Sequence, residues 1–340
     1  MKNKALHKTA PDTHILTIVG LMVLALILMA ILQPGNYFTL KNAKSMIFQF
    51  PEYGVLALGM MACMIAGGID LSLVGIMNLS GVLAALIVKN MVLIEGGEVA
   101  NPAMVVPAIV LACVVAVVVG AACGAFNGFI IGYFGLPAML VTLCGLQLYT
   151  GLAYGITGGP AINGMCDAFK NIANGTVAGI PYVLFIFIAV VAVVVFIMKC
   201  TVFGHEIYFL GSNAQAAMYS GINTLKVTIM TYMFSGILGG ISGILITSHL
   251  NSAKSSNGST YTLLSLLIVV LGGVHPDGGK GRVAGVVLAV LLLQMIANAF
   301  GLMHMSDNAK TFANGCLLIA ALVLSVVLEK REAQKAAAAS

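Results

Sequence analysis

Long apolar runs separated by short polar segments dominate the chain. Because a helical crossing of a membrane takes about 20 apolar residues, the pattern predicts an all-α polytopic membrane protein of about ten transmembrane helices. One run is short for a full crossing, and another is longer than a crossing needs. Pro51 falls in the first turns of its run, where proline is best tolerated. The expected spans, within a single transmembrane domain over residues 1–340, are 15–32, 45–65, 73–94, 103–134, 136–156, 181–198, 226–248, 261–271, 283–303 and 311–328.

Composition supports this interpretation and excludes several other classes. The chain is 60% hydrophobic and 8% charged, whereas about a quarter of the residues in a soluble domain are charged. The net charge of +5 comes from loop lysines and gives no reason to expect a nucleic-acid partner. Six histidines without helical i, i+4 pairing give no metal signal. We therefore expect no catalytic residues, no metal and no cofactor.

The distribution of lysine and arginine predicts the orientation in the cell membrane. Ten spans put both termini on one side. With the termini inside, ten of the 16 basic residues lie in inner segments and six in outer ones. Because cytoplasmic loops carry an excess of Lys and Arg, both termini are expected in the cytoplasm. Segments 67–72, 199–225 and 272–282 then lie on or near the cytoplasmic side.

A glycine-rich break follows the second expected span. Its sequence is Ala66-Gly67-Gly68-Ile69-Asp70-Leu71-Ser72. A carboxylate in mid-membrane costs roughly 2.5–3.5 kcal/mol, so Asp70 is either a functional charge facing a path or part of a tight turn. The orientation count favours the turn. In that interpretation Gly67 and Gly68 break the helix, and Asp70 or Ser72 caps the next one.

A second glycine pair resembles this break. Residues 270–274 (Val-Leu-Gly-Gly-Val) are similar to residues 65–69, and Asp277 follows soon after. Corresponding glycine-interrupted segments in two halves of a chain are typical of a transport path. Gly272 and Gly273 are therefore candidates for the path beside Gly67, Gly68, Asp70 and Ser72.

Small and polar residues inside the spans have two possible roles. Glycines at every fourth position mark a helix face that allows close packing. The glycines predicted to pack in this way are Gly120, Gly124, Gly128 and Gly132 in one span and Gly236 and Gly240 in another. Polar side chains could line a path, although an interhelical hydrogen bond is their more common role. These are Asn78, Thr142, Gln147, Gln294 and Asn298.

The segment 203–223 is too short for a domain and too patterned for a plain linker. Asn213 is a candidate N-cap for a short helix, and Ser220-Gly221 is a stop signal. A short helix of this kind suits docking into a groove of another protein.

Four stretches together resemble the permease subunit of ribose-type ABC sugar importers, the ribose/xylose/arabinose/galactose permease family. They span about residues 50 to 300, in the order of the family. They are Ala66-Gly-Gly-Ile-Asp-Leu-Ser72 with Leu79-Ser-Gly81; Leu136-Pro-Ala-Met-Leu-Val-Thr-Leu143 with Gly151-Leu-Ala153 and Thr157-Gly-Gly159; Gly211-Ser-Asn-Ala-Gln-Ala-Ala217 with Ser220-Gly-Ile222; and Val269-Val-Leu-Gly-Gly273 with Gly278-Gly-Lys-Gly281.

The resemblance implies an ABC importer permease fold with no enzyme activity of its own, surrounded by membrane lipid. It implies a second permease subunit (the same chain or a paralogue), two cytoplasmic ATP-binding subunits that hydrolyse ATP, and an extracytoplasmic solute-binding protein. It places Gly67–Ser72 and the facing Gly272-Gly273 near the path. The residues that it places at the ATPase-coupling segment are Gly211, Asn213, Ala216, Ala217, Ser220 and Gly221.

Three functions remain open at this point. The first is ATP-driven import of a small polar solute. A monosaccharide is the favoured solute, and a nucleoside or a furanose signalling molecule is the alternative. The second is secondary transport driven by an ion gradient, with Asp70 as the proton or sodium site. The third is a membrane scaffold without transport, against which the broken helices and the polar residues in several spans argue.

Overall fold

A computed structural model describes residues 13–92, 102–306, 308–310, 312–317, 319 and 323. The described chain is almost entirely helical, and its strands are four segments of two residues. The predicted all-α class is therefore confirmed. The long helices are α1 (Thr13–Leu32), α3 (Leu40–Ile65), α4 (Leu73–Val92), α5 (Val105–Phe134), α6 (Ala138–Thr157), α8 (Tyr182–Cys200), α11 (Thr224–Leu250) and α13 (Val283–Leu302).

Eight helices among the described residues are long and apolar enough to cross a membrane, as expected for a polytopic membrane protein. The 11-residue α12 (Tyr261–Leu271) is apolar but shorter. The expected span 311–328 lies largely outside the described residues. The remaining helices are α2 (Pro34–Tyr37), the 3₁₀ turn Pro102–Met104, α7 (Asp167–Asn174), α9 (Val202–Ser212) and α10 (Ala214–Tyr219).

The α3 helix begins earlier than expected. The Thr39 side chain accepts a hydrogen bond from the Asn42 N–H (3.2 Å), which caps the helix one turn before the apolar run. The Asn42 amide then bonds to the carbonyl of Tyr37 (2.9 Å) and holds this polar turn in place. Pro51 consequently lies in the helix interior, and its expected place in the first turns was wrong.

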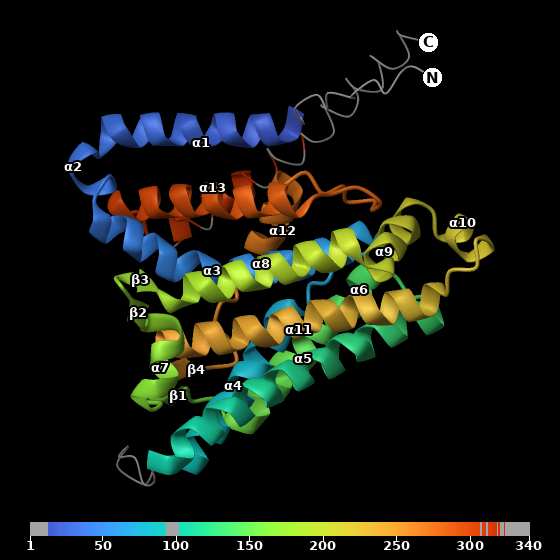
Figure 1. Cartoon of the computed structure of the whole chain (residues 1–340), viewed down its shortest axis with the longest axis horizontal. Coiled ribbons are helices and arrows are strands. Elements are labelled where there is room, and N and C mark those ends of the chain that lie inside the picture. Colours follow the sequence, from blue (N-terminus) through green and yellow to red (C-terminus); the bar gives the residue numbers. More distant parts are fainter. Residues whose placement is uncertain are drawn as a thin grey trace, which may run out of the picture.

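Most long helices run side by side along the longest axis of the molecule (Figure 1). The α9 and α10 helices lie at one end, called the α10 end here. The α7 helix and the strands lie at the other, called the α7 end. The α1 helix occupies the edge of the bundle and packs against α13.

The α11 helix is the central rod of the bundle, because it packs against α3, α4 and α5. Small residues make this possible. The predicted glycines of α5 lie against α11, and a Cβ on either Gly120 or Gly236 would overlap the other's carbonyl oxygen. The backbones of the two helices therefore touch without intervening side chains.

The α7 end is capped by short structures that the apolar pattern did not indicate. Strand β1 (Ile162–Asn163) pairs antiparallel with β4 (Ser252–Ala253), and β2 (Thr176–Val177) pairs with β3 (Ile180–Pro181). The amphipathic α7 helix buries Phe169 beneath it. Its end is tied to α11 because the Ala173 N–H donates to Ser248 Oγ (3.0 Å).

Candidate functional site: a broken helix and its hydrogen-bonded chain

The predicted break after α3 is a left-handed glycine turn. Gly67 has φ +89°. Its N–H bonds to the carbonyl of Met64 (3.0 Å), and the Gly68 N–H bonds to the carbonyl of Cys63 (2.9 Å). This pair of bonds is the Schellman motif, which ends a helix on a glycine. Gly68 is also tightly packed, since a Cβ there would overlap the hydroxyl of Tyr232.

The second glycine pair ends α12 with the same motif. Gly273 has φ +80°. Its N–H bonds to the carbonyl of Val270 (3.0 Å), and the Val274 N–H bonds to the carbonyl of Val269 (3.2 Å). The likeness of the two breaks is thus physical. In the structure Gly273 corresponds to Gly67, whereas the sequence similarity pairs Gly67 with Gly272.

Asp70 lies in the break and is fully buried. Its Oδ1 accepts hydrogen bonds from the Ser72 N–H (3.1 Å) and the Ser72 hydroxyl (2.6 Å), and its Oδ2 accepts one from the Ser235 hydroxyl (2.8 Å). The first bond forms the turn that precedes α4. Asp70 thus lies in the turn between the end of α3 and the start of α4, and it is buried against Ser235, which lies near the middle of α11. Three neutral donors compensate its burial.

The hydrogen bonds continue from Asp70 across two more helices. The Asn127 amide on α5 donates to Ser72 Oγ (2.8 Å), and the Tyr149 hydroxyl on α6 donates to Asn127 Oδ1 (2.8 Å). Each of these side chains is buried. The sequence did not single out Ser235, Asn127 or Tyr149. This polar chain joins α11, the break, α5 and α6, and it sets how these elements sit around the broken helix.

Three segments meet backbone to backbone at the α10 end of the break. We call Gly67, Gly211, Gly278 and Gly279 the glycine junction. A Cβ on Gly278 would lie 2.8 Å from the Gly67 Cα and 2.9 Å from the Gly211 oxygen. The Gly279 N–H donates to the carbonyl of Ile65 (2.8 Å), the last residue of α3. The end of α9, the end of α3 and the loop before α13 are therefore in direct contact.

The junction corrects one expectation. Gly272-Gly273 was expected to face Gly67–Ser72, but the contact with Gly67 is made by Gly278, further along the same loop. Gly272 packs instead against α13, where a Cβ would lie 2.8 Å from the Val286 Cα. Gly278 and Gly279 both have positive φ, so their glycine-rich sequence was a usable signal.

Two other predicted path residues bond to backbone carbonyls of other segments. The Thr142 hydroxyl on α6 donates to the carbonyl of Ile69 (2.9 Å), inside the break. The Asn78 amide on α4 donates to the carbonyl of Ser255 (2.8 Å), in the loop before α12. Within the described residues the Asn78 Oδ1 atom is buried without a partner.

The remaining three predicted path residues lie elsewhere. Asn298 on α13 forms paired amide bonds with Asn42 on α3 (2.9 and 2.8 Å). Gln294 accepts a hydrogen bond from the Tyr53 hydroxyl. Both are interhelical hydrogen bonds, the alternative role considered for such residues. Gln147 is exposed on α6 and takes no part in the chain from Asp70.

The predicted coupling segment is a pair of helices. The α9 helix ends at Ser212, and Asn213 caps α10 by accepting a hydrogen bond from the Ala216 N–H (2.9 Å), so the expected N-cap is confirmed. Asn213, Ala216, Ser220 and Gly221 are exposed, whereas Ala217 is buried against the chain. The predicted stop is also observed, because Gly221 has φ +84° and ends α10.

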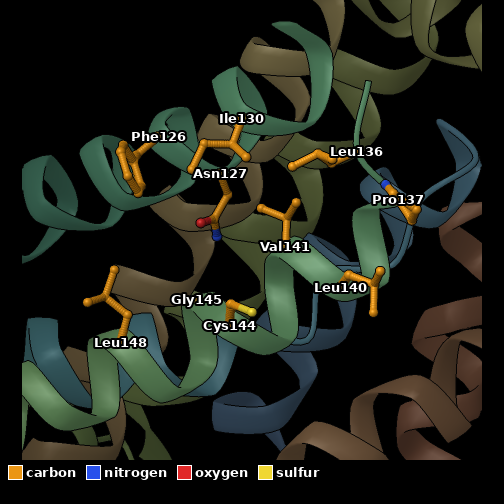
Figure 2. A pocket seen from close by; sticks show the side chains of 10 residues that line it. All are labelled: Phe126, Asn127, Ile130, Leu136, Pro137, Leu140, Val141, Cys144, Gly145 and Leu148. Carbon is orange, nitrogen blue, oxygen red and sulfur yellow. The ribbon is translucent and has the colours of Figure 1, made fainter. Parts of the chain in front are cut away.

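An apolar cleft of about 460 Å³ lies between α5 and α6. Figure 2 shows Asn127 reaching from α5 toward α6 within it. The Asn127 amide is already bonded to Ser72 and Tyr149, and apart from the Cys144 thiol the other side chains that line the cleft are apolar. The other side chains around it are Phe126, Ile130, Leu136, Pro137, Leu140, Val141, Cys144, Gly145 and Leu148.

A buried acid at the α7 end went unnoticed in the sequence. Glu52 on α3 contacts the His249 ring at the end of α11, and its other oxygen accepts a hydrogen bond from the Tyr261 hydroxyl (3.1 Å). An acid inside an apolar run was the available signal. His249 and Tyr261 could not be found in this way, because they are distant in sequence.

Broken helices, a buried polar chain and eight candidate spans are features of a membrane transport protein. A family model described as "Branched-chain amino acid transport system / permease component" matches residues 42–322. The chain is 31% identical to the ribose import permease protein of Haemophilus influenzae over 306 residues, which are 89% of this chain and 90% of the relative. It is 27% identical to the L-arabinose transport system permease protein of Escherichia coli, over 87% of this chain and 85% of the relative.

A third relative is the autoinducer 2 import system permease protein LsrD of Yersinia pestis, which is 28% identical over 91% of this chain and 90% of the relative. No solved structure matched the chain. The chain is a multi-pass membrane protein of the cell membrane and a transport component. It belongs to the permease-component family described above.

The hydrogen bonds around Asp70 predict different results for two replacements. Asn keeps an acceptor for Ser72 and can donate to Ser235, so Asp70→Asn is expected to retain transport within about threefold. Asp70→Leu orphans buried partners at roughly 1–3 kcal/mol each, and we expect little folded protein. Size-exclusion recovery and uptake test both. Loss of uptake in well-assembled Asp70→Asn would show that the charge itself is needed and would favour the ion-gradient alternative.

Proposed function

We propose that this chain is the transmembrane subunit of an ATP-driven, binding-protein-dependent importer of a monosaccharide. The named relatives import or transport ribose, L-arabinose and autoinducer 2, which favours a small hydroxylated solute. The observation that carries the proposal is the glycine junction, because it joins the exposed α9–α10 segment directly to the break after α3 and to the loop that follows the break after α12. A movement imposed on α10 would reach the breaks without passing through flexible side chains.

The proposed assembly has two copies of the permease, or this chain with a paralogue, two ATP-binding subunits and an extracytoplasmic binding protein. Residues 1–340 form its single transmembrane permease domain. The excess of Lys and Arg supports cytoplasmic termini. The α10 end then faces the ATP-binding subunits, and α7 with strands β1–β4 faces the binding protein.

The exposed side of α10 supports its role as the ATPase contact. Met218 is 55% exposed and Tyr219 is 84% exposed, on a six-residue helix that projects from the bundle (Figure 1). Exposed large apolar side chains on a projecting helix are typical of docking into a groove. Asn213, Ala216, Ser220 and Gly221 lie on the same projection, while Gly211 and the buried Ala217 connect it to the bundle.

The solute path is proposed to run beside the two breaks. Gly67, Gly68, Asp70, Ser72 and Thr142 gather at the first break, and Gly273 ends α12 with the same turn as Gly67. Asn78 lies further along α4, where it bonds to the loop before α12. Asp70 and Ser72 have their hydrogen bonds satisfied by the protein. We therefore assign them the role of holding the breaks in shape. The close contact between α5 and α11, called the seam here, lets the two helices move as one unit. Its glycines are Gly120, Gly124, Gly128, Gly132, Gly236 and Gly240.

The function is tested in proteoliposomes that contain this chain with its ATP-binding and solute-binding partners. We expect uptake of labelled D-ribose or L-arabinose. This uptake should require ATP on the side of the membrane that the α10 end faces and the binding protein on the opposite side. The chain alone under a proton or sodium gradient should give no uptake. Gradient-driven uptake by the chain alone would replace this proposal with secondary transport.

Tyr219 provides a test of the ATPase contact. Removal of a central aromatic anchor from an interface costs about 2 kcal/mol, so Tyr219→Ala should weaken co-purification of the ATP-binding subunit about 30-fold and lower uptake with it. Tyr154→Ala is the matched control, because Tyr154 is also exposed but lies on α6. Equal ATPase recovery from the Tyr219→Ala and control variants would remove α10 as the contact.

A further inference from the structure

Glu52 occupies an unusual position in this chain. It is the only Asp or Glu within the eight candidate spans of the described residues. Its side chain is 3% exposed. An ionisable side chain inside a membrane domain is costly and generally marks a path or a binding site. The two breaks and the glycine junction do not involve this acid.

The surroundings of Glu52 are polar on several sides. His249 from α11 contacts one carboxylate oxygen, and the Tyr261 hydroxyl from α12 donates to the other (3.1 Å). The adjacent Tyr53 bonds through its hydroxyl to Gln294 on α13. The Gln294 amide in turn donates to Gln49 Oε1 (3.3 Å). Four helices thus contribute a carboxylate, an imidazole, two phenols and two amides to one cluster.

The cluster also has an aromatic wall and exposed margins. The rings of Tyr53 and Tyr261 pack edge to face with their centroids 5.7 Å apart. His249 is 25% exposed, and Gln49 is exposed at the other margin of the cluster. In this conformation the polar groups satisfy one another. Separation of α12 or the end of α11 from α3 would free the Glu52 carboxylate for a new partner.

We propose that this cluster, centred on Glu52, is a binding site for a neutral polyhydroxylated solute at the α7 end of the path. A carboxylate and amides can accept and donate to adjacent hydroxyls, and a phenol ring can cover the apolar face of a sugar ring. A zwitterionic amino acid would need a cation facing its carboxylate, but the imidazole in the cluster is paired with Glu52. The assignment rests on the proposed function in that the solute bound is the one transported.

The site is tested by binding, independently of transport. The chain contains no tryptophan, so Tyr261→Trp places a single fluorescent reporter beside Glu52, where its indole N–H can still donate. We expect a saturable emission change with D-ribose or L-arabinose in the purified full-length chain. Glu52→Gln in the same background should weaken binding by about tenfold or more, because a hydrogen bond to a charged group is lost.

Several outcomes would overturn the site. They are no saturable change with either sugar, an unchanged affinity in the Glu52→Gln variant, or the same response to L-leucine as to the sugars. The control reporter is Tyr154→Trp, on the exposed face of α6, and an equal response from it would also overturn the site. Recovery as a single size-exclusion peak shows that each variant is folded.

A second measurement separates binding from a structural role. In the complete importer, Glu52→Gln should lower sugar uptake about tenfold while ATP hydrolysis stimulated by the binding protein stays within twofold. A parallel loss of both activities would indicate a structural role and overturn the site. If the unmodified importer showed no ATP-driven uptake while the tryptophan reporter still bound sugar, the proposed function would fail and the binding site would stand.

Discussion

Gly211→Ala is expected to uncouple the importer, so that ATP hydrolysis continues while solute uptake falls by more than about tenfold. A Cβ at this position would overlap the carbonyl oxygen of Ile65 and lie 2.6 Å from the Gly279 nitrogen. Both atoms belong to the backbone and cannot turn aside as a side chain could. The added methyl group therefore pushes α9 away from the end of α3 and opens the glycine junction, at a strain of about 1–3 kcal/mol.

The measurement is the ratio of solute imported to ATP hydrolysed in proteoliposomes. Gly20→Ala is the control, because it adds the same methyl group to a helix position with nothing within 4 Å. A second variant, Tyr208→Phe, removes only the hydrogen bond from the Tyr208 hydroxyl to the carbonyl of Gly281 (2.8 Å) and should lower the ratio by a smaller factor. Tight coupling in Gly211→Ala would exclude the junction as the route from α10 to the breaks.

The sequence predicted the helices well because most of them are simply apolar for the length of a membrane. It was less reliable where polar residues extend a helix. Thr39 and Asn42 begin α3 by capping it, and no count of apolar residues contains that information. The same holds for α7 and the short strands, whose formation depends on contacts with the far end of α11.

The breaks illustrate what local chemistry can and cannot decide. A glycine pair after an apolar run predicts a helix end, and both α3 and α12 end in this way. The glycine with positive φ is the first of the pair after α3 (Gly67) and the second of the pair after α12 (Gly273). An alignment of the two glycine pairs by sequence is therefore shifted by one residue from their structural correspondence. The partners of the break, Gly211 and Gly278, come from segments far along the chain and follow only from the tertiary fold.

The polar residues show the same limit. Each polar residue within a span was visible in the sequence, but its role depended on a partner from another helix. Asp70 is held by Ser235 and is linked through Ser72 to Asn127, whereas Asn298 forms a simple pair with Asn42. Glu52 differs from these in that its acid was itself the signal.

Gly236→Ala is expected to be among the most destabilising single replacements in the bundle, with much less folded protein recovered. A Cβ on Gly236 would overlap the Gly120 carbonyl oxygen, and one on Gly124 would overlap the carbonyl oxygen of Tyr232. Because α11 packs more extensively on α5 than on any other helix, a shift of one backbone against the other disturbs the whole seam. Overpacking of this kind costs about 1–3 kcal/mol.

Gly132 of the seam and Gly151 of α6 supply graded controls for that prediction. A Cβ on Gly132 would meet the terminal Cδ1 of Leu225 at 2.8 Å, and this flexible side chain can move away, whereas Gly151 has nothing within 4 Å. The melting temperature of the purified chain should therefore fall steeply for Gly236→Ala, slightly for Gly132→Ala and not at all for Gly151→Ala. If Gly132→Ala were as damaging as Gly236→Ala, backbone contact would not be what makes the glycines necessary. The face would then act through helix flexibility, which an alanine at any of these positions reduces equally.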